Sequence, residues 1–479
     1  MRMVKMDETS PQNPFQATFE RLRSRRWQVA RTDARTRIAK LKQLRRTLVE
    51  RREALAKAMH EDFRKPVAEV ELSEVLIVLQ ELDHTIKHLA RWMKPRKVGT
   101  PVMLAGTRGE VRYEPKGVVL ILAPWNYPFQ LLVGPLIAAV AAGNCAMVKP
   151  SEKTPHTAAF TKQLLEDVFE PDEVAVAMGG ADVGNALLEL PFDHFFFTGG
   201  PRVGRKVMEA AAKHLAGVTL ELGGKSPVIV DETADVKAAA ERVVWGKFLN
   251  GGQTCVAPDY VYVHASKEEA LLAQVKETLA AFYGKTEEAR RASADFCRMV
   301  DEGQFARVNG LLERSVAGGA RVEAGGVVDA ASRYIAPTVL SGVKPDTAVM
   351  EEEIFGPLLP VLRYERLDEV IEHIQAGSKP LAMYIFSHDK GNVEELLSRT
   401  SAGGTCVNTT VVHFSHSELP FGGVGESGVG NYHGEYGFKT FSHERSVLRQ
   451  GPVSFLHYLF PPYTEKVRKM QRMASRLFE

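Results

Sequence analysis

The chain contains 479 residues, of which 44% are hydrophobic and 25% are charged. This composition excludes a disordered chain and supplies enough apolar side chains for more than one core. The 61 Lys and Arg residues are balanced by 59 Asp and Glu residues, so there is no overall basic field of the kind that attracts nucleic acid. The four cysteines are too few and too widely spaced for a disulfide framework or a CxxC metal site. We therefore expect a cytoplasmic protein without a metal ion.

The N-terminal region is rich in basic residues. Residues 1–16 contain no continuous apolar run, which argues against a secretory signal. Between residues 21 and 65 there are 16 Lys or Arg and five Asp or Glu, with leucines at helical spacing. An amphipathic helix with a solvated basic face is favoured over a nucleic-acid-binding helix, because the only aromatic residues, Trp27 and Phe63, do not alternate with the charges. A second helix is expected at 67–92.

A long uncharged segment follows at 117–148, where 32 residues contain no Asp, Glu, Lys or Arg. Three prolines and three Asn or Gln residues interrupt it, which makes a membrane span costly. We predict instead a buried strand at 118–122 and an apolar helix around 137–142. The residues before it, 101–115, are predicted to form a hairpin whose turn contains Gly106 or Gly109.

From residue 117 onward, short apolar runs alternate with helical patterns. Repeated βα units of this length predict an α/β fold with two parallel-sheet domains, the first of them Rossmann-like. A further strand is expected at 440–448. The strands of the first series are expected at 118–122, 146–149, 174–177, 194–198 and 218–222, and the second series runs from 227–230 to 405–408.

Three residues stand out for chemistry. Cys255 follows two glycines at the end of a predicted helix, although a lone cysteine is more often a small buried hydrophobic residue. Glu221 ends an apolar strand, where a carboxylate is costly unless it is paired or catalytic. Asn126 follows another strand and could donate its amide to an oxyanion, or could simply be a turn residue before Pro128.

A glycine-rich turn is the candidate phosphate site. Gly199, Gly200 and Gly204 lie in GGPRVG, directly after a predicted strand and at the start of a predicted helix. Free backbone N–H groups at a helix N-terminus suit a phosphate. The spacing is not GxGxxG, and Gly-Pro is also common punctuation at helix starts.

Taken together, these segments resemble the NAD(P)-dependent aldehyde dehydrogenase superfamily, from about residue 20 to residue 450. The residues after Cys255, together with the runs at 431–448 and 460–463, are similar to the class 3 branch, which includes fatty, aromatic and coniferyl aldehyde dehydrogenases. The motifs occur in the family's order: PWNYPF at 124–129, KPSE at 149–152, FTGG at 197–200, LELGGKSP at 220–227, GQTC at 252–255, EEIFGP at 352–357 and PFGG at 420–423.

The resemblance implies a role for each candidate residue. Cys255 would be the nucleophile and Glu221 the general base, and Asn126 with the backbone N–H of Cys255 would form the oxyanion hole. The chain departs from the family at Gly200, where Ser or Asn is frequent, and at Glu426, where the class 3 branch often has Asn. The implied cofactor contacts are Trp125, Gly199, Gly200 and Gly204 at the pyrophosphate, Lys149 and Glu152 at the adenosine ribose, and Glu353 and Phe355 at the nicotinamide ribose.

The expected reaction is oxidation of a medium-chain, long-chain or aromatic aldehyde to its carboxylic acid. NAD is the expected cofactor, and acceptance of NADP is left open because Glu152 disfavours a 2′-phosphate while class 3 relatives often use both. A CoA-acylating enzyme is the alternative reaction, and Glu221 argues for water as the acceptor. A non-catalytic relative is the alternative class.

Domain limits follow from the same pattern. We expect a cofactor domain at 1–100 and 116–220, a catalytic domain at 221–412, and an oligomerisation arm at 101–115 and 413–455 that builds a homodimer. The remaining residues, 456–479, form an amphipathic basic tail over 464–479. Docking of this tail on the enzyme's own surface or on its dimer partner is favoured over an interfacial membrane contact.

Overall fold

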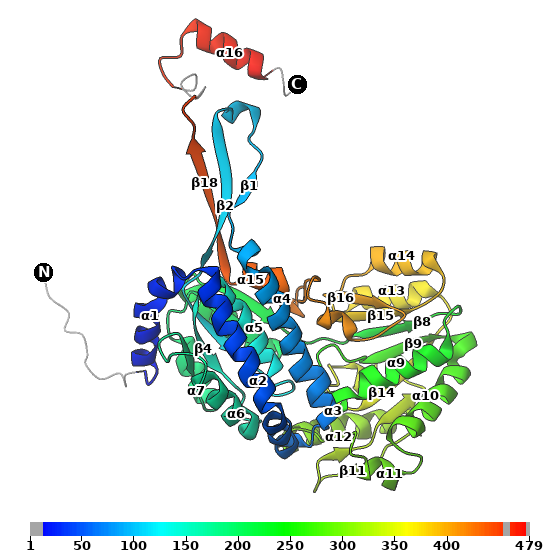
Figure 1. Cartoon of the computed structure of the whole chain (residues 1–479). Helices are drawn as coiled ribbons and strands as arrows, with labels where there is room; N and C mark the ends of the chain where they lie inside the picture. The colour runs from blue at the N-terminus through cyan, green and yellow to red at the C-terminus, as the bar shows by residue number, and fades with distance from the viewer. Residues whose placement is uncertain (1–12, 454–459, 476–479) are drawn as a thin grey trace, which may run out of the picture.

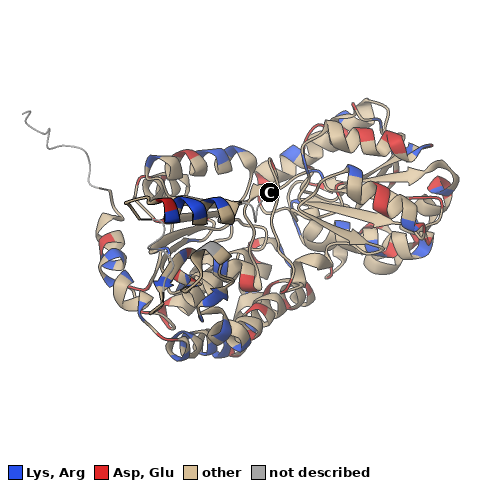
Figure 2. Cartoon of the chain, turned by 90° about the horizontal axis from the view of Figure 1, so that it is seen from above, with Lys and Arg blue, Asp and Glu red and all other residues tan. Residues whose placement is uncertain are grey.

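The computed structural model describes residues 13–453 and 460–475. Two α/β bodies lie side by side, and a narrow β arm projects from one of them (Figure 1). This arrangement confirms the predicted fold class. Acidic and basic residues are intermingled along the ribbons of both bodies rather than gathered in one basic stripe (Figure 2).

The N-terminal helices confirm the amphipathic interpretation. Leu41, Leu44 and Leu48 are fully buried, whereas most of the basic side chains of the same helix remain at the surface. After this helix the chain turns through a π-helical segment at Glu71–Val75. The helices of the region are α1 (Gln16–Ala30), α2 (Ala34–Phe63), α3 (Val67–Val70) and α4 (Leu76–Trp92).

The first body is built on a six-stranded sheet with the order β17-β7-β6-β3-β4-β5. Five of its strands run parallel to one another, as predicted, and β17 (Gly428–Val429) pairs antiparallel with β7. The parallel strands are β3 (Val118–Leu122), β4 (Cys145–Lys149), β5 (Val174–Val176), β6 (His194–Thr198) and β7 (Gly217–Glu221). The helices between them are α5 (Gln130–Ala142), α6 (Pro155–Glu166), α7 (Ala181–Leu188) and α8 (Pro201–Lys213).

Helix α5 accounts for the uncharged segment. All of its residues are buried, and Pro135 lies inside it. A helix that is apolar on every side belongs in the centre of a large body. None of the helices formed by the described residues is both long and apolar enough to cross a bilayer.

The second body contains a seven-stranded sheet with the order β10-β13-β14-β9-β8-β15-β16. Its strands are parallel except for β10, which pairs antiparallel with β13. The strands are β8 (Pro227–Val230), β9 (Tyr260–His264), β10 (Arg321–Ala324), β13 (Thr338–Ser341), β14 (Leu358–Tyr364), β15 (Ala382–Phe386) and β16 (Gly404–Val407). A short hairpin, β11 (Val328–Asp329) and β12 (Tyr334–Ile335), lies apart from this sheet, and the helices are α9 (Val236–Phe248), α10 (Glu268–Tyr283), α11 (Glu287–Ala292), α12 (Glu302–Ala317), α13 (Leu367–Ala376) and α14 (Lys390–Arg399).

The arm corrects the predicted hairpin at 101–115. Residues 107–115 form one continuous strand, β2 (Thr107–Pro115), so Gly109 lies inside a strand rather than in a turn. The strand pairs along its whole length with β18 (Ser442–Gln450) and at three residues with β1 (Arg96–Val98). A hairpin is nevertheless present: β1 pairs antiparallel with β2, and Gly106, with a φ of 91°, lies in the turn that precedes β2, as one of the two predicted alternatives had it. The longer partner, β18, is more than 300 residues away, and no local pattern indicates it.

The predicted arm segment 413–455 is also too long. Residues 428–429 extend the sheet of the first body, and α15 (Gly434–Thr440) packs on α5 and α4. Only the residues from 442 onward leave the body (Figure 1).

The tail forms α16 (Glu465–Ser475) at the far end of the arm (Figure 1). Met470 and Met473 are exposed there, so the prediction that the tail docks on the chain's own surface is wrong for the described residues. Leu477 and Phe478, two apolar residues of the predicted amphipathic tail, lie outside the described residues.

Candidate active site

A cleft of about 540 Å³ lies where the two bodies meet. Its walls come from the ends of β3, β6 and β7 in the first body and from loops of the second body. Cys255, Glu221 and Asn126 all line it. Residues that the sequence separates by up to 129 positions are therefore brought to one surface.

The loop that carries Cys255 is fixed by unusual backbone conformations. Asn250 and Gly251 have φ angles of 53° and 60°, in the left-handed region. Gly252 cannot be replaced without a shift, because an added Cβ would lie 2.3 Å from the carbonyl oxygen of Gly356. The turn brings Cys255 to the cleft with its side chain partly exposed. Burial, with the nearby charges of Glu353 and Glu221, raises the pKa of the Cys255 thiol to about 12.

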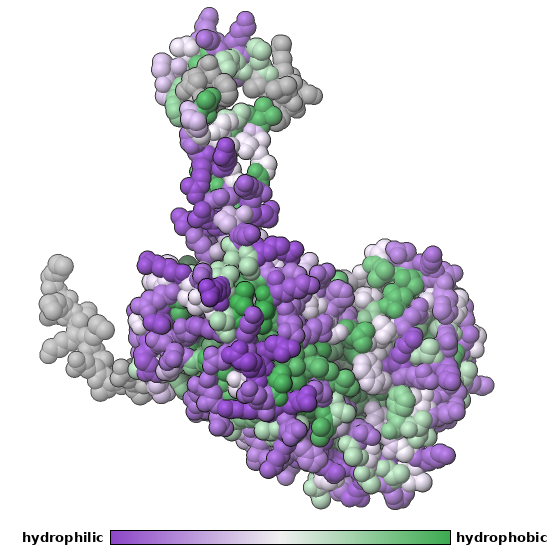
Figure 3. All heavy atoms as spheres, viewed as in Figure 1, coloured by the Kyte–Doolittle hydropathy of each residue, from purple (hydrophilic) through white to green (hydrophobic). Residues whose placement is uncertain are grey.

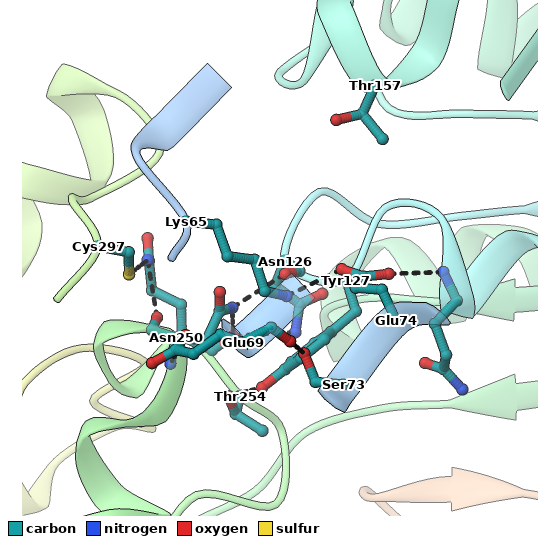
Figure 4. Close-up of polar contacts among 12 residues, drawn as sticks. Lys65, Glu69, Ser73, Glu74, Asn126, Tyr127, Thr157, Asn250, Thr254 and Cys297 are labelled. Carbon is teal, nitrogen blue, oxygen red and sulfur yellow. Dashed lines mark hydrogen bonds and ion pairs between the residues drawn. The ribbon is translucent and has the colours of Figure 1, made fainter. Parts of the chain in front are cut away.

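Asn126 is held against the same loop. Its Nδ2 donates to the carbonyl oxygen of Gln253 at 3.1 Å, and its own carbonyl oxygen accepts from Nδ2 of Asn250 at 2.9 Å (Figure 4). An amide nitrogen carries two hydrogens. One is used in holding Asn126, and the second is available to an oxygen atom in the cleft.

Glu221 is buried at the end of β7, and neither carboxyl oxygen has a hydrogen-bond partner among the described residues. Loss of hydration raises the pKa of this carboxyl well above its usual value. An unpaired, desolvated carboxyl group that lines a cleft beside a thiol is a strong proton acceptor.

Part of the predicted cofactor set lines the same cleft: Trp125, Gly199, Gly200, Glu353 and Phe355. Gly200 caps α8 without any side-chain hydrogen bond, and a Cβ added there would meet nothing within 4 Å. The open backbone at the start of this helix suits a pyrophosphate group. The rings of Trp125 and Phe355 meet edge to face at 5.3 Å.

Glu353 lies against the loop that follows Glu221. A Cβ added to Gly223 would lie 2.1 Å from Oε2 of Glu353, so glycine is needed there for the carboxyl to approach. The backbone N–H of Gly224 donates to this carboxyl. Burial raises the pKa of Glu353 to about 8.

Three predicted cofactor residues do not line this cleft. Lys149 and Glu152 form an ion pair of 3.0 Å after the end of β4. Gly204 is buried in α8, where an added Cβ would meet Leu222 at 2.9 Å. Its small size therefore lets the helix pack closely on the residue that follows β7.

Glu426, which had no interpretation from the sequence, reaches the edge of the cleft. It forms an ion pair with Arg205 of α8 at 2.9 Å, and both side chains are more than 60% exposed. The pair connects the loop before β17 to α8, the helix that begins at the glycine-rich turn.

Sequence reasoning missed a second pocket, on the other side of Cys255. Aromatic and aliphatic side chains from four separated segments form most of its wall. A signal was available at Tyr127, which lies in the same motif as Asn126. The lining includes Tyr127, Leu131, Val411, Phe414, Phe421, Tyr432 and His433, together with Thr254 and Cys255.

No cluster of His, Cys, Asp or Glu among the residues with described positions is arranged to hold a metal ion.

The chain matches the model of the aldehyde dehydrogenase family over residues 12–447. It is 43% identical to the 4,4'-diaponeurosporen-aldehyde dehydrogenase of Staphylococcus aureus over 89% of this chain and 92% of that protein. It is 41% identical to a probable coniferyl aldehyde dehydrogenase of Pseudomonas aeruginosa, over 96% and 95% of the two chains.

Among solved structures, the substrate-bound state of Staphylococcus aureus AldH matches with a TM-score of 0.91 and 41% identity, covering 95% of this chain and 98% of that one. The NAD+ complex of an aldehyde dehydrogenase from Bacillus cereus matches with a TM-score of 0.82 and 26% identity, over 92% and 88% of the two chains.

Proposed function

Because the chain belongs to the aldehyde dehydrogenase family, we propose that it oxidises an aldehyde to the carboxylic acid through a thioester on Cys255 that water hydrolyses. The observation that carries this proposal is the shared cleft. A partly exposed thiol, an unpaired carboxyl group and a free amide N–H face the same space as an open helix N-terminus.

Each residue has one task in the proposed reaction. The thiol of Cys255 loses its proton to water in the cleft, and the resulting thiolate attacks the aldehyde carbon, whose oxygen becomes negative. Nδ2 of Asn126 and the N–H of Cys255 stabilise that oxygen. Bound NAD supplies the hydride acceptor. Glu221 then takes a proton from the water that attacks the thioester carbon, and the sulfur of Cys255 leaves.

NAD is the proposed cofactor. The open backbone at Gly200 supports a pyrophosphate at the start of α8. The carboxylate of Glu152 beside Lys149 favours a ribose hydroxyl over a 2′-phosphate. Glu353 and Phe355 would hold the nicotinamide end, next to Cys255. Initial rates with NAD and NADP at equal concentrations test this preference.

The proposed substrates are medium-chain or long-chain aliphatic aldehydes and aromatic aldehydes. The second pocket supports the apolar character of these substrates, because its wall is mainly apolar and includes Cys255, and its volume of about 30 Å³ means that the wall must open to admit a chain or ring. A panel of such aldehydes should give NADH absorbance near 340 nm, and Cys255→Ala should give none. Oxidation that requires added coenzyme A would contradict water as the acceptor.

We also propose that two chains associate through the arm. Strand β18 lies at the edge of the three-stranded arm sheet, and an exposed strand edge is readily completed by a partner. A second surface could also be covered in a dimer: apolar side chains gather on the segment from α3 to the start of α4, where Val67, Leu72 and Leu76 are exposed (Figure 3). Light scattering should give about twice the 52.9 kDa chain mass. A monomer mass at micromolar concentration would contradict this.

We also propose that the tail helix α16 contacts either the partner subunit or a membrane surface. Met470 and Met473 are exposed on α16, and Lys466, Lys469 and Arg472 accompany them. The charged residues of this helix are mainly basic (Figure 2). Salt-sensitive sedimentation with anionic liposomes that is lost on truncation after Tyr463 supports the membrane. A lower melting temperature on truncation, without liposome binding, supports the partner subunit.

A further inference from the structure

A charge cluster in which Lys65 and Glu74 are buried and Glu69 is half-buried lies behind the active-site loops and takes no part in the proposed chemistry. Its members, Lys65, Glu69 and Glu74, come from the short segment between α2 and α4. Nζ of Lys65 lies 2.9 Å from Oε1 of Glu74, and both side chains are completely buried. Burying a cation and a carboxylate is costly even when they pair, so hydrophobic residues would stabilise this position as well or better. Their presence calls for a reason other than stability.

The cluster contacts the loop that carries Asn126. Nζ of Lys65 lies 3.9 Å from the ring centroid of Tyr127, the next residue in the chain after Asn126. Oε2 of Glu74 accepts from the backbone N–H of Gln130 at 2.7 Å, at the start of α5. A cation over an aromatic ring and a charge-assisted hydrogen bond are both directional. Together they fix the loop at each end.

The same cluster contacts the loop that carries Cys255. The hydroxyl of Tyr127 shares a hydrogen bond of 2.7 Å with Thr254, the residue before the thiol. Oε2 of Glu69 accepts from the backbone N–H of Asn250 at 2.9 Å. Nδ2 of Asn250 in turn donates to the carbonyl oxygens of Asn126 and Gln253. Figure 4 shows Lys65, Tyr127 and Glu74 beside these two loops.

The backbone of the segment makes this double contact possible. In the π-helical turn at Glu71–Val75 hydrogen bonds join residues five apart. Glu74 lies in this turn, and Glu69 lies just before it in α3. One short segment can therefore place a carboxylate on each of the two loops, with Lys65 between them.

We propose that Lys65, Glu69 and Glu74 are positioning residues, which set the spacing between the amide of Asn126 and the backbone N–H of Cys255. This inference rests on the proposed function. Two oxyanion donors act together only when both lie within hydrogen-bond distance of the developing charge. A small displacement of one loop relative to the other therefore slows hydride loss from the tetrahedral species on Cys255.

The test compares Lys65→Met, Glu74→Leu, which removes the acceptor for the N–H of Gln130, and the double variant. With an aldehyde deuterated at C1, rapid mixing measures the rate of the first NADH turnover and its isotope effect. Each single variant should slow that turnover by roughly 10- to 100-fold, raise the isotope effect on steady-state turnover, and leave the KM for NAD unchanged. The double variant should recover most of the melting temperature that each single variant loses, because both members of the fully buried ion pair are then replaced. It should not recover the rate, because the cation over Tyr127 is absent.

Glu69 allows an independent test of the same inference. Glu69→Ala should slow the first turnover, and Glu69→Gln should restore it, because an amide oxygen still accepts from Asn250. The control is Glu173→Gln. Glu173 is buried just before β5, at the edge of the first sheet, where it forms an ion pair with Lys40 of α2. This variant should lower the melting temperature and leave the isotope effect unchanged.

Two results overturn the inference. One is a first turnover at the wild-type rate in the single variants, and the other is a rate that recovers with the melting temperature in the double variant. Either result leaves the proposed function intact. Failure of the wild-type protein to reduce NAD with any aldehyde of the panel would instead remove the proposed function itself.

Discussion

Replacing Glu221 with Gln should separate the two halves of the reaction. The amide keeps the size of the side chain but cannot take a proton from water. Thioester formation should continue, and hydrolysis should slow by about 10²- to 10⁴-fold, the usual contribution of a general base. That loss corresponds to about 3–5 kcal/mol of barrier, at 1.36 kcal/mol for each tenfold change.

The structure also fixes the direction of the stability change. Both oxygens of Glu221 are buried without partners, and burial raises the pKa of the carboxyl well above its usual value. The folded protein therefore binds this proton more tightly than the unfolded chain, so stability from this group is present at low pH and falls as the pH rises above the unfolded pKa of about 4.3. Glu221→Gln should be at least as stable as the wild type at pH 7, and its advantage should grow with pH.

Rapid mixing with NAD and an aldehyde provides the assay. Glu221→Gln should release about one NADH per active site in a burst and then turn over slowly, as an accumulating thioester requires. Glu81→Gln is the matched control, because Glu81 is another buried carboxyl group that does not line the cleft and already accepts from Gly434. Full steady-state turnover by Glu221→Gln, or loss of the burst itself, would refute the assigned role.

Asn126→Ala should lower kcat by about 10²- to 10³-fold, the usual effect of removing one oxyanion donor, and a change confined to KM would contradict this role. The rate of alkylation of Cys255 by iodoacetamide in the free protein should rise about tenfold per pH unit up to pH 10. Only the thiolate reacts, and burial raises the pKa of this thiol to about 12. A rate that levels off near neutral pH would contradict the raised pKa. Lys247 is buried, its Nζ has no partner among the described residues, and burial lowers its pKa to about 8. Its protonation therefore disfavours folding at pH 7, so Lys247→Met should stabilise the protein by up to about 3 kcal/mol, with the gain shrinking between pH 8 and pH 10.5; calorimetry that shows destabilisation at pH 7 would contradict this. Glu426→Gln should change stability by less than about 1 kcal/mol, because its ion pair with Arg205 is exposed, and calorimetry in low and high salt checks it.

Much of the fold was predictable because it depends on local patterns. The apolar runs at 118–122, 194–198 and 227–230 became strands with the predicted limits, since a strand buried on both faces needs nothing but apolar side chains. Cys255 and Glu221 could be selected because each is out of place in its own segment. Their meeting in one cleft depends instead on how the two bodies pack, because Glu221 ends a strand of the first sheet and Cys255 lies in a loop of the second body.

The arm and the support of the active site were decided by tertiary structure. The strand at 107–115 has its partner at 442–450, and no local pattern specifies a pairing across such a separation. The hydrogen bond from Asn250 to Glu69 joins residues 181 positions apart. The local sequence identifies candidate residues, because their chemistry conflicts with the segment in which they lie. The partners that hold these residues in place belong to distant segments, which only folding brings together.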